Sequence, residues 1–192
     1  MTDQLAGMKV AFLAADMTEK PELTEPYDAL KEAGADVELL SIKEGEIDLF
    51  DHYDRAESFK VDRLVGEADA SGYDALVLPG GVGNPDALRL DDDAVSFVRE
   101  FFDQDKPVGA ICHAPWMLIE AGVVSGRTLT SWPSLKTDLE NAGAKRVDEE
   151  VVVDGRLVTS RKPDDLPAFN AKLIETFGAA ASRTPQAAGS SS

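Results

Sequence analysis

Cys112 is the only cysteine in the chain, and it stands between a short apolar run, residues 108–111, and a helical pattern that starts at His113. This order predicts a buried strand that turns abruptly into a helix at the cysteine. A thiol at such a turn lies beside free backbone NH groups and the positive end of the helix, which favour the thiolate over the thiol. Because a thiolate attacks carbonyl carbons and reacts with peroxide, the sequence predicts a reactive cysteine.

The alternative for Cys112 is an inert role, since unpaired cysteines are often buried as small apolar side chains. Its position favours chemistry, because it follows a predicted parallel strand and ligands of open α/β sheets bind at the carboxyl ends of such strands. The turn also resembles the nucleophile turn of hydrolases. There, the residue after the nucleophile donates one NH to an oxyanion hole.

The elements that must position Cys112 follow from the apolar pattern. Four buried strands are predicted, at residues 9–15, 37–42, 73–78 and 108–111. Helical patterns separate most of them, and in the first one Leu23, Tyr27 and Leu30 share one face. Strands that alternate with helices predict an α/β fold with a parallel sheet.

The segment between the second and third of these strands, residues 43–72, is polar and could hold an added hairpin. His52 lies there among carboxylates, a combination that could hold a metal ion. Solvated loop charge is the favoured interpretation, because no second histidine stands at ligand spacing.

A glycine cluster, Gly80, Gly81 and Gly83, follows the strand at 73–78. Glycines allow backbone NH groups to approach a ligand or a neighbouring loop closely. The spacing is not that of a dinucleotide-binding turn, and the sequence has no Walker-type phosphate loop.

The last third of the chain predicts a strand at 127–131, a helix at 133–142 and a hairpin over 151–159. The pair Asp154-Gly155 between apolar runs favours a type I′ turn in that hairpin.

A final helix starts near residues 163–165. Its apolar positions are Leu166, Phe169, Leu173 and Phe177. Residues 182–192 are small and polar and predict a flexible tail, and residues 1–181 are expected to form a single domain.

The chain carries 36 acidic and 19 basic side chains, a formal charge of −17. Such a surface repels phosphate backbones and anionic membranes, so neither nucleic acid nor a membrane is an expected partner. No apolar run approaches the roughly 20 residues of a spanning helix, and the first residues lack signal-peptide features. We therefore expect a cytoplasmic protein, and a single cysteine excludes an internal disulfide.

Four stretches in order resemble one known family. They are residues 74–81 (DALVLPGG), 110–115 (AICHAP), 130–134 (TSWPS) and 159–167 (TSRKPDDLP). They resemble the PfpI family of intracellular proteases, in the superfamily with a glutamine amidotransferase-like fold that includes the parkinsonism-associated protein deglycase. The resemblance implies a flavodoxin-like three-layer sandwich, with a mainly parallel sheet between helices plus a small hairpin, and assembly into a homodimer or homohexamer.

The same resemblance implies roles for particular residues. Cys112 falls on the family nucleophile and His113 on the histidine beside it. Glu22 falls on a carboxyl group that hydrogen-bonds the thiolate and steers its oxidation, and Gly81 on a backbone donor that pairs with the NH of His113 as an oxyanion hole. The alternative interpretation of Glu22 is a surface carboxylate at a helix start. That of His113 is a core or interface histidine without a catalytic role.

Two positions depart from the family pattern. Protease-like members place a glutamate from a neighbouring subunit against the histidine, and the nearest equivalent here is Asp86. The alternative interpretation is that Asp86 is an ordinary turn residue. Ala114 replaces a common glycine and is expected to narrow the pocket beside the cysteine.

Two functions are compatible with these residues. The first is a stress-protective cysteine-dependent hydrolase acting on small carbonyl compounds, glycated proteins or peptides, as a peptidase, a deglycase or a glyoxalase-like enzyme. The second is a redox-responsive protein in which peroxide oxidises Cys112 with little turnover. No metal or organic cofactor is implied by either function.

Overall fold

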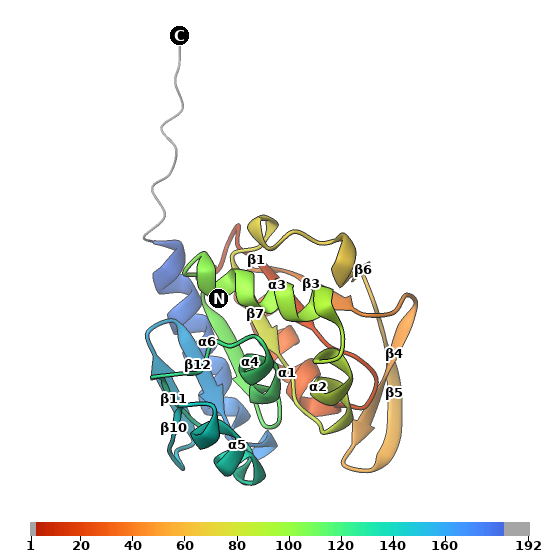
Figure 1. The fold of residues 1–192 in the computed structure, drawn as a ribbon. Helices are drawn as coiled ribbons and strands as arrows, with labels where there is room; N and C mark the ends of the chain where they lie inside the picture. The colour runs from red at the N-terminus through yellow and green to blue at the C-terminus, as the bar shows by residue number, and fades with distance from the viewer. Residues whose placement is uncertain (1–2, 183–192) are drawn as a thin grey trace.

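A seven-stranded sheet forms the centre of the computed structural model, which describes residues 3–182 (Figure 1). In spatial order the strands are β11 (Val151–Asp154), β12 (Leu157–Ser160), β8 (Val108–Ile111), β7 (Ala75–Leu78), β1 (Lys9–Leu13), β3 (Asp36–Ser41) and β6 (Arg63–Leu64). All neighbouring pairs are parallel except β11 with β12.

The inner five strands follow the flavodoxin-like order, in which the first strand lies between the second and the third. The predicted α/β sandwich with a mainly parallel sheet is therefore confirmed. In this order the carboxyl ends of β7, β8 and β12 lie side by side, which is where ligands bind in open α/β sheets.

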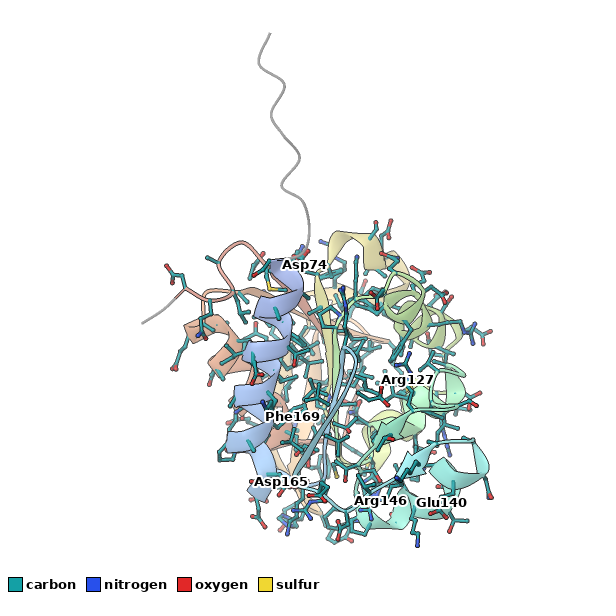
Figure 2. The ribbon with its side chains drawn as sticks, turned by 90° about the vertical axis from the view of Figure 1, so that its left-hand side faces the viewer. Asp74, Arg127, Glu140, Arg146, Asp165 and Phe169 are labelled. Atoms are coloured by element: carbon teal, nitrogen blue, oxygen red, sulfur yellow. The ribbon has the colours of Figure 1, made fainter. Side chains whose placement is uncertain are left out.

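Helices cover both faces of the sheet, as Figure 2 shows with the sheet between them. The α-helices are α1 (Lys20–Glu32), α2 (Gly83–Leu88), α3 (Asp92–Asp103), α4 (Pro115–Glu120), α5 (Lys136–Asn141) and α6 (Leu166–Ala181). Short 3-10 helices occur at Val65–Glu67, Ala70–Gly72, Pro133–Leu135 and Pro163–Asp165.

Alternating residues of the strands divide the core into two clusters. On β1, Val10 and Phe12 pack with α1 and α6, whereas Ala11 and Leu13 pack with α2, α3 and α4. This is the pattern of a strand with both faces covered. The four predicted apolar positions of α6 are all fully buried, and Phe169 points from α6 toward the sheet in Figure 2.

Two small sheets lie outside the central one. The polar segment after β3 forms the hairpin of β4 (Glu46–Asp51) and β5 (Asp54–Lys60), and β4 also pairs with β2 (Thr18–Glu19). The other pairs β9 (Thr128–Leu129) with β10 (Lys145–Arg146). The suggested hairpin thus exists, and through β2 it is attached to the segment that leads into α1.

Some local expectations were wrong. The strand predicted at 127–131 is only the two residues of β9, and the helix after Cys112 begins at Pro115 instead of His113. The hairpin loop consists of Gly155 and Arg156, of which Gly155 alone has a positive φ, +60°. A type I′ turn needs positive φ at both central residues, so the turn has the pattern of type II′.

The predicted flexible tail lies outside the described residues, apart from its first position, Ser182. Among residues 3–182, no helix is both long and apolar enough to cross a membrane.

Candidate active site

The polypeptide bends sharply at Cys112, directly after β8. Its φ is +64°, a value that costs strain in a residue other than glycine. Two backbone hydrogen bonds hold the bend, because the NH of Cys112 donates to Ser160 at 3.1 Å and its carbonyl accepts from Trp132 at 2.9 Å. The sheet therefore forces the side chain into a fixed position, and the predicted elbow is present.

The sulfur of Cys112 is surrounded by the groups that the sequence singled out. The Nδ1 atom of His113 lies 3.2 Å from the Sγ atom. The backbone NH groups of Gly81 and His113 and the carboxyl group of Glu22 are all close enough to act on the pKa of the thiol. Four of the five predicted site residues thus meet at one point.

Glu22 is fully buried in the first turn of α1, so its interpretation as a surface carboxylate is wrong. No described group hydrogen-bonds its carboxyl oxygens in good geometry, although the NH groups of Gly80 and Gly81 and the Cys112 thiol act on it from nearby. Burial, and next the charge of Glu19, raise the pKa of Glu22 to about 8. Glu22 therefore carries a proton at neutral pH and can donate it to a hydrogen bond.

The environment of Cys112 opposes thiolate formation. Only 6% of the residue is exposed, and burial, followed by the charge of Glu22, raises the pKa of its thiol. The NH groups of Gly81 and His113 act in the other direction but are outweighed. The prediction that the following helix lowers the pKa of this thiol is wrong, because α4 starts three residues later, at Pro115, and is short.

Glu22 and Cys112 form a coupled pair of acids, and their raised pKa values mean that each holds its own proton at neutral pH. Two coupled acids in contact titrate as a pair, and the repulsion between them exists only when both are ionised. When Glu22 is neutral, no carboxylate repels the thiolate, and the protonated carboxyl group can donate a hydrogen bond to it.

A buried side chain whose role the sequence analysis did not predict, that of Asn84, holds the Gly80–Gly81 loop in place. The amide of Asn84, fully buried, donates to the carbonyls of Pro79 and Gly80 at 2.9 and 3.0 Å. Its side-chain oxygen accepts from the NH of Ala15 at 2.7 Å. Asn84 thereby ties the Gly80–Gly81 loop to the end of β1, and only its place within the glycine cluster signalled this role.

Glycine is required at residue 80 because the side chains of Glu22 and Cys112 lie close to its backbone. A Cβ atom there would overlap the carboxylate of Glu22 and lie 2.6 Å from the Cβ of Cys112 and 2.8 Å from the carbonyl of Ile111. Real Cβ atoms do not come this close to other heavy atoms.

We expect Gly80→Ala to destabilise the protein by about 1–3 kcal/mol, the usual cost of overpacking, and to slow alkylation of Cys112. Urea unfolding and iodoacetamide kinetics measure the two effects. Gly72→Ala is the matched control, since a Cβ at Gly72 meets no atom within 4 Å. Equal behaviour of the two variants would show that Gly80 is not a point of close approach.

His113 is held between two indole rings. Its ring stacks on Trp132 at 5.8 Å between centroids and meets Trp116 edge-on at 5.2 Å. Burial lowers the pKa of His113 to about 4, so the ring is neutral at neutral pH and able to accept a proton.

Contact of Asp86 with the histidine of a neighbouring subunit stays a prediction, whereas Ala114 lies elsewhere than expected. In α2, the carboxylate of Asp86 is exposed and pairs with Arg89 at 2.9 Å, and no hydrogen bond or ion pair joins it to His113 in residues 3–182. Ala114 is buried in the core instead of lining the cavity, so its methyl group does not narrow the site.

A cavity of about 330 Å³ opens over Cys112. Glu22, Gly81 and His113 line its floor, and its rim carries the exposed apolar side chains Met17, Tyr53, Val82 and Trp132. Its volume lies at the lower end of the range for small-molecule sites, about 300–1,000 Å³.

His52 reaches the rim of this cavity from the turn between β4 and β5. Its Nδ1 atom lies 2.8 Å from Asp51 and 3.8 Å from Glu19, and one donor atom from each of the three residues falls within 4.8 Å of the others. The surrounding carboxylates, Asp51 first, raise the pKa of His52. One histidine with two carboxylates is fewer protein ligands than a closed zinc site uses.

The fold and this site define a class of protein: a flavodoxin-like sandwich that presents one cysteine on a strained turn beside a buried, protonated glutamate. The sequence profile of the DJ-1/PfpI family matches residues 8–176. The chain belongs to that family.

The chain matches several named relatives over nearly the whole length of each relative. The chain is 46% identical to Deglycase PH1704 of Pyrococcus horikoshii over 88% of this chain and 98% of that protein. Two proteins of Bacillus subtilis, putative cysteine protease YraA and general stress protein 18, are 43% and 44% identical, over 86% and 88% of this chain and 96% of each relative.

A solved structure supports the fold as well. It is a two-domain protein of Anabaena variabilis with DJ-1/ThiJ/PfpI-like and ferritin-like domains, which superimposes with a TM-score of 0.83 at 37% identity. The match covers 88% of this chain and 50% of that one, so the chain spans half the length of the two-domain protein.

Proposed function

We propose that this protein is a stress-protective cysteine hydrolase of the PfpI type that acts on carbonyl or acyl groups of small molecules, glycated proteins or peptides. The observation that carries the proposal is the convergence of His113, Glu22 and two backbone NH groups on the sulfur of Cys112. The names of the relatives, deglycase, putative cysteine protease and general stress protein, support the same class.

With an acyl substrate such as a peptide, the proposed reaction proceeds by acyl transfer. The sulfur of Cys112 attacks the carbonyl carbon while His113 accepts the thiol proton through Nδ1. The NH groups of Gly81 and His113 stabilise the oxyanion, and the leaving amine departs with the proton from His113. Water then hydrolyses the thioester, which releases the acid and restores the thiol.

In this mechanism, Glu22 acts as a neutral acid. Its protonated carboxyl group donates a hydrogen bond to the sulfur as negative charge develops there. At pH values above about 8, ionisation of Glu22 opposes that charge, so we expect the rate to fall on the alkaline side.

The test is a turnover assay with a methylglyoxal-treated peptide and a chromogenic peptide, each at large excess over protein. More product than protein, from either substrate, supports the hydrolase. Product that stops at one equivalent per Cys112, together with oxygen addition to Cys112 under mild peroxide seen by intact mass, would replace the proposal with the redox-responsive function.

Asp86 is expected to contribute little within one chain, since its carboxylate is occupied by Arg89. We expect Asp86→Ala to change kcat/KM by less than about twofold, as is usual for exposed ion pairs away from the reacting atoms. Asp92→Ala, which removes another exposed carboxylate, is the matched control. A tenfold or greater loss confined to Asp86→Ala would instead assign this carboxylate to the site of a second copy.

Assembly into a homodimer or homohexamer and a cytoplasmic location belong to the same proposal. The exposed apolar rim of the cavity, which includes Val82 and Trp132, is a surface that substrate or a second copy would cover.

A further inference from the structure

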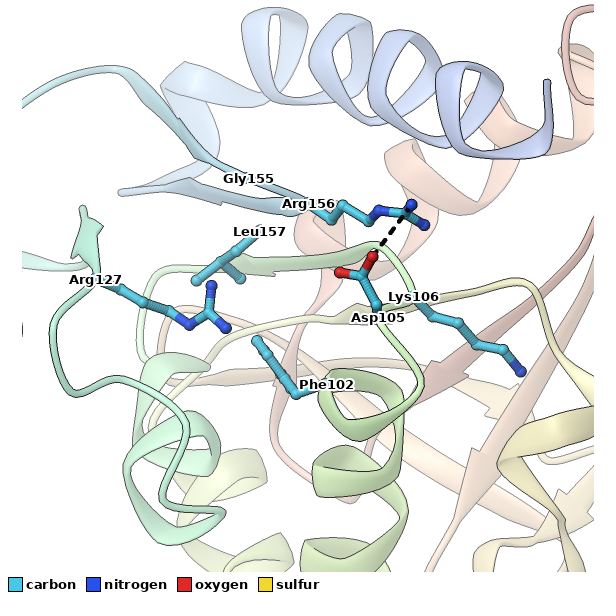
Figure 3. Close-up of a pocket in the computed structure, with 7 residues that line it drawn as sticks. All are labelled: Phe102, Asp105, Lys106, Arg127, Gly155, Arg156 and Leu157. Carbon is cyan, nitrogen blue, oxygen red and sulfur yellow. Dashed lines mark ion pairs between the residues drawn. The ribbon is translucent and has the colours of Figure 1, made fainter. Parts of the chain in front are cut away.

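A second cavity lies at the opposite end of the sheet from Cys112 (Figure 3). Its volume is about 290 Å³, and it is formed by the residues before β8, the residue before β9 and the turn between β11 and β12. The four residues of β8 separate it from Cys112 by about 13 Å, at about 3.3 Å per residue. It therefore takes no part in the chemistry described above.

Positive charge dominates this cavity although the chain as a whole is strongly acidic. Three cationic residues, Lys106, Arg127 and Arg156, and one carboxylate, Asp105, line it. Asp105 pairs with Arg156 at 3.2 Å. Lys106 donates to the carbonyl of Ala70 at 2.8 Å and points away from the hollow in Figure 3.

Arg127 is held rigidly with part of its guanidinium free. Its Nε atom donates to the carbonyl of Val123 at 2.8 Å, and its guanidinium carbon lies 5.1 Å from the centre of the Phe102 ring. Figure 3 shows this guanidinium turned inward beside Phe102 and Leu157. Within residues 3–182, its two terminal nitrogens take part in none of the hydrogen bonds or ion pairs.

The neighbouring carboxylates do not neutralise Arg127. Asp105 is directed to Arg156, and Asp154 accepts the NH of Thr128 at 2.6 Å. An arginine that is immobilised by stacking and by one hydrogen bond loses little entropy when its remaining donors bind an oxyanion. Such a fork matches the geometry of a phosphate group.

The geometry points to a binding site for a phosphate group in this cavity, with Arg127 as its principal ligand and Arg156 as the second. Arg127 adds a positive charge that no ion pair within residues 3–182 balances, which favours an anion as the ligand. The apolar side chains of Phe102 and Leu157 provide a surface for a small organic body, so a phosphate monoester is the class of ligand that uses the whole cavity. A Cβ at Gly155 would meet nothing within 4 Å, which leaves the mouth open.

The experiment follows thermal unfolding of the full chain at constant ionic strength with increasing glycerol 3-phosphate, inorganic phosphate, glycerol or sodium chloride. We expect Tm to rise with the two phosphates only, and the rise to saturate at a phosphate concentration of about 10 mM. Tighter binding of glycerol 3-phosphate than of inorganic phosphate would identify the ester as the ligand, and equal binding would identify the free ion.

Variants localise the effect. Arg127→Gln and Arg156→Gln should each weaken phosphate binding about tenfold or more, as expected for loss of a charge-assisted hydrogen bond. Lys145→Gln, which removes an exposed cation from β10, should not. Arg127→Lys keeps the charge but removes the fork, so it tests the site even where Arg127→Gln does not fold. Absence of a saturable shift, or an equal shift in all variants, would overturn the proposal.

Discussion

Replacement of Cys112 by serine is expected to lower kcat/KM by at least about 10³-fold, because a serine hydroxyl in this pocket lacks a base strong enough to activate it. His113, the candidate base, has a pKa lowered to about 4 by burial and accepts a proton from a hydroxyl far less readily than from a thiol. The measurement is turnover of the methylglyoxal-treated or chromogenic peptide by variant and parent protein at matched concentration.

The fold should survive this substitution. Serine is similar in size and tolerates the φ of +64° about as well as cysteine, so we expect the free energy of unfolding to change by no more than about 2 kcal/mol. Urea unfolding supplies the control. A correctly folded Cys112→Ser protein with more than about a tenth of the parent rate would remove the cysteine from the mechanism.

Replacement of Glu22 by glutamine is expected to change how stability depends on pH. The pKa of Glu22 is raised from 4.5 to about 8 in the folded protein, mainly by burial. Between these two values the unfolded chain has lost the proton while the folded chain keeps it, so raising the pH favours unfolding. The penalty is absent below about pH 4.5, grows up to about pH 8 and then stays constant.

Glutamine does not ionise, so Glu22→Gln should lack this loss. The difference in free energy of unfolding, variant minus parent, should therefore increase between pH 4.5 and pH 8.5 by up to about 5 kcal/mol. The increase amounts to about 1.4 kcal/mol for each pH unit between the two pKa values. Urea unfolding at several pH values measures the difference. Glu25→Gln, an exposed position on the same helix, should follow the parent curve. Parallel curves for parent and Glu22→Gln would mean that Glu22 is ionised when folded.

The local pattern of apolar residues was enough to predict most strands and helices of the fold. Apolar runs and their spacing predicted the strands that surround Cys112, the face of α1 and the buried positions of α6, because periodicity reports which side of an element meets the core. The elbow at Cys112 was predictable for the same reason, since an apolar run ends there and a helix soon follows.

Contacts between distant segments decided what the site can do. Glu22 reaches Cys112 only because β1 and β8 flank β7 in the sheet, and its burial, which sets its protonation, comes from that packing. The tie from Asn84 to Ala15 and the direction of Asp86 are likewise settled by neighbours that no local pattern reveals.

The sequence by itself therefore determined the α/β order, the family and the cysteine at the strand end, because short stretches of the chain carry each of these signals. Only the tertiary structure decided the charge states of Glu22 and Cys112 and the cationic cavity around Arg127. Burial and electrostatic interaction act through space, and the cavity assembles Phe102, Arg127 and Arg156 from three separate segments.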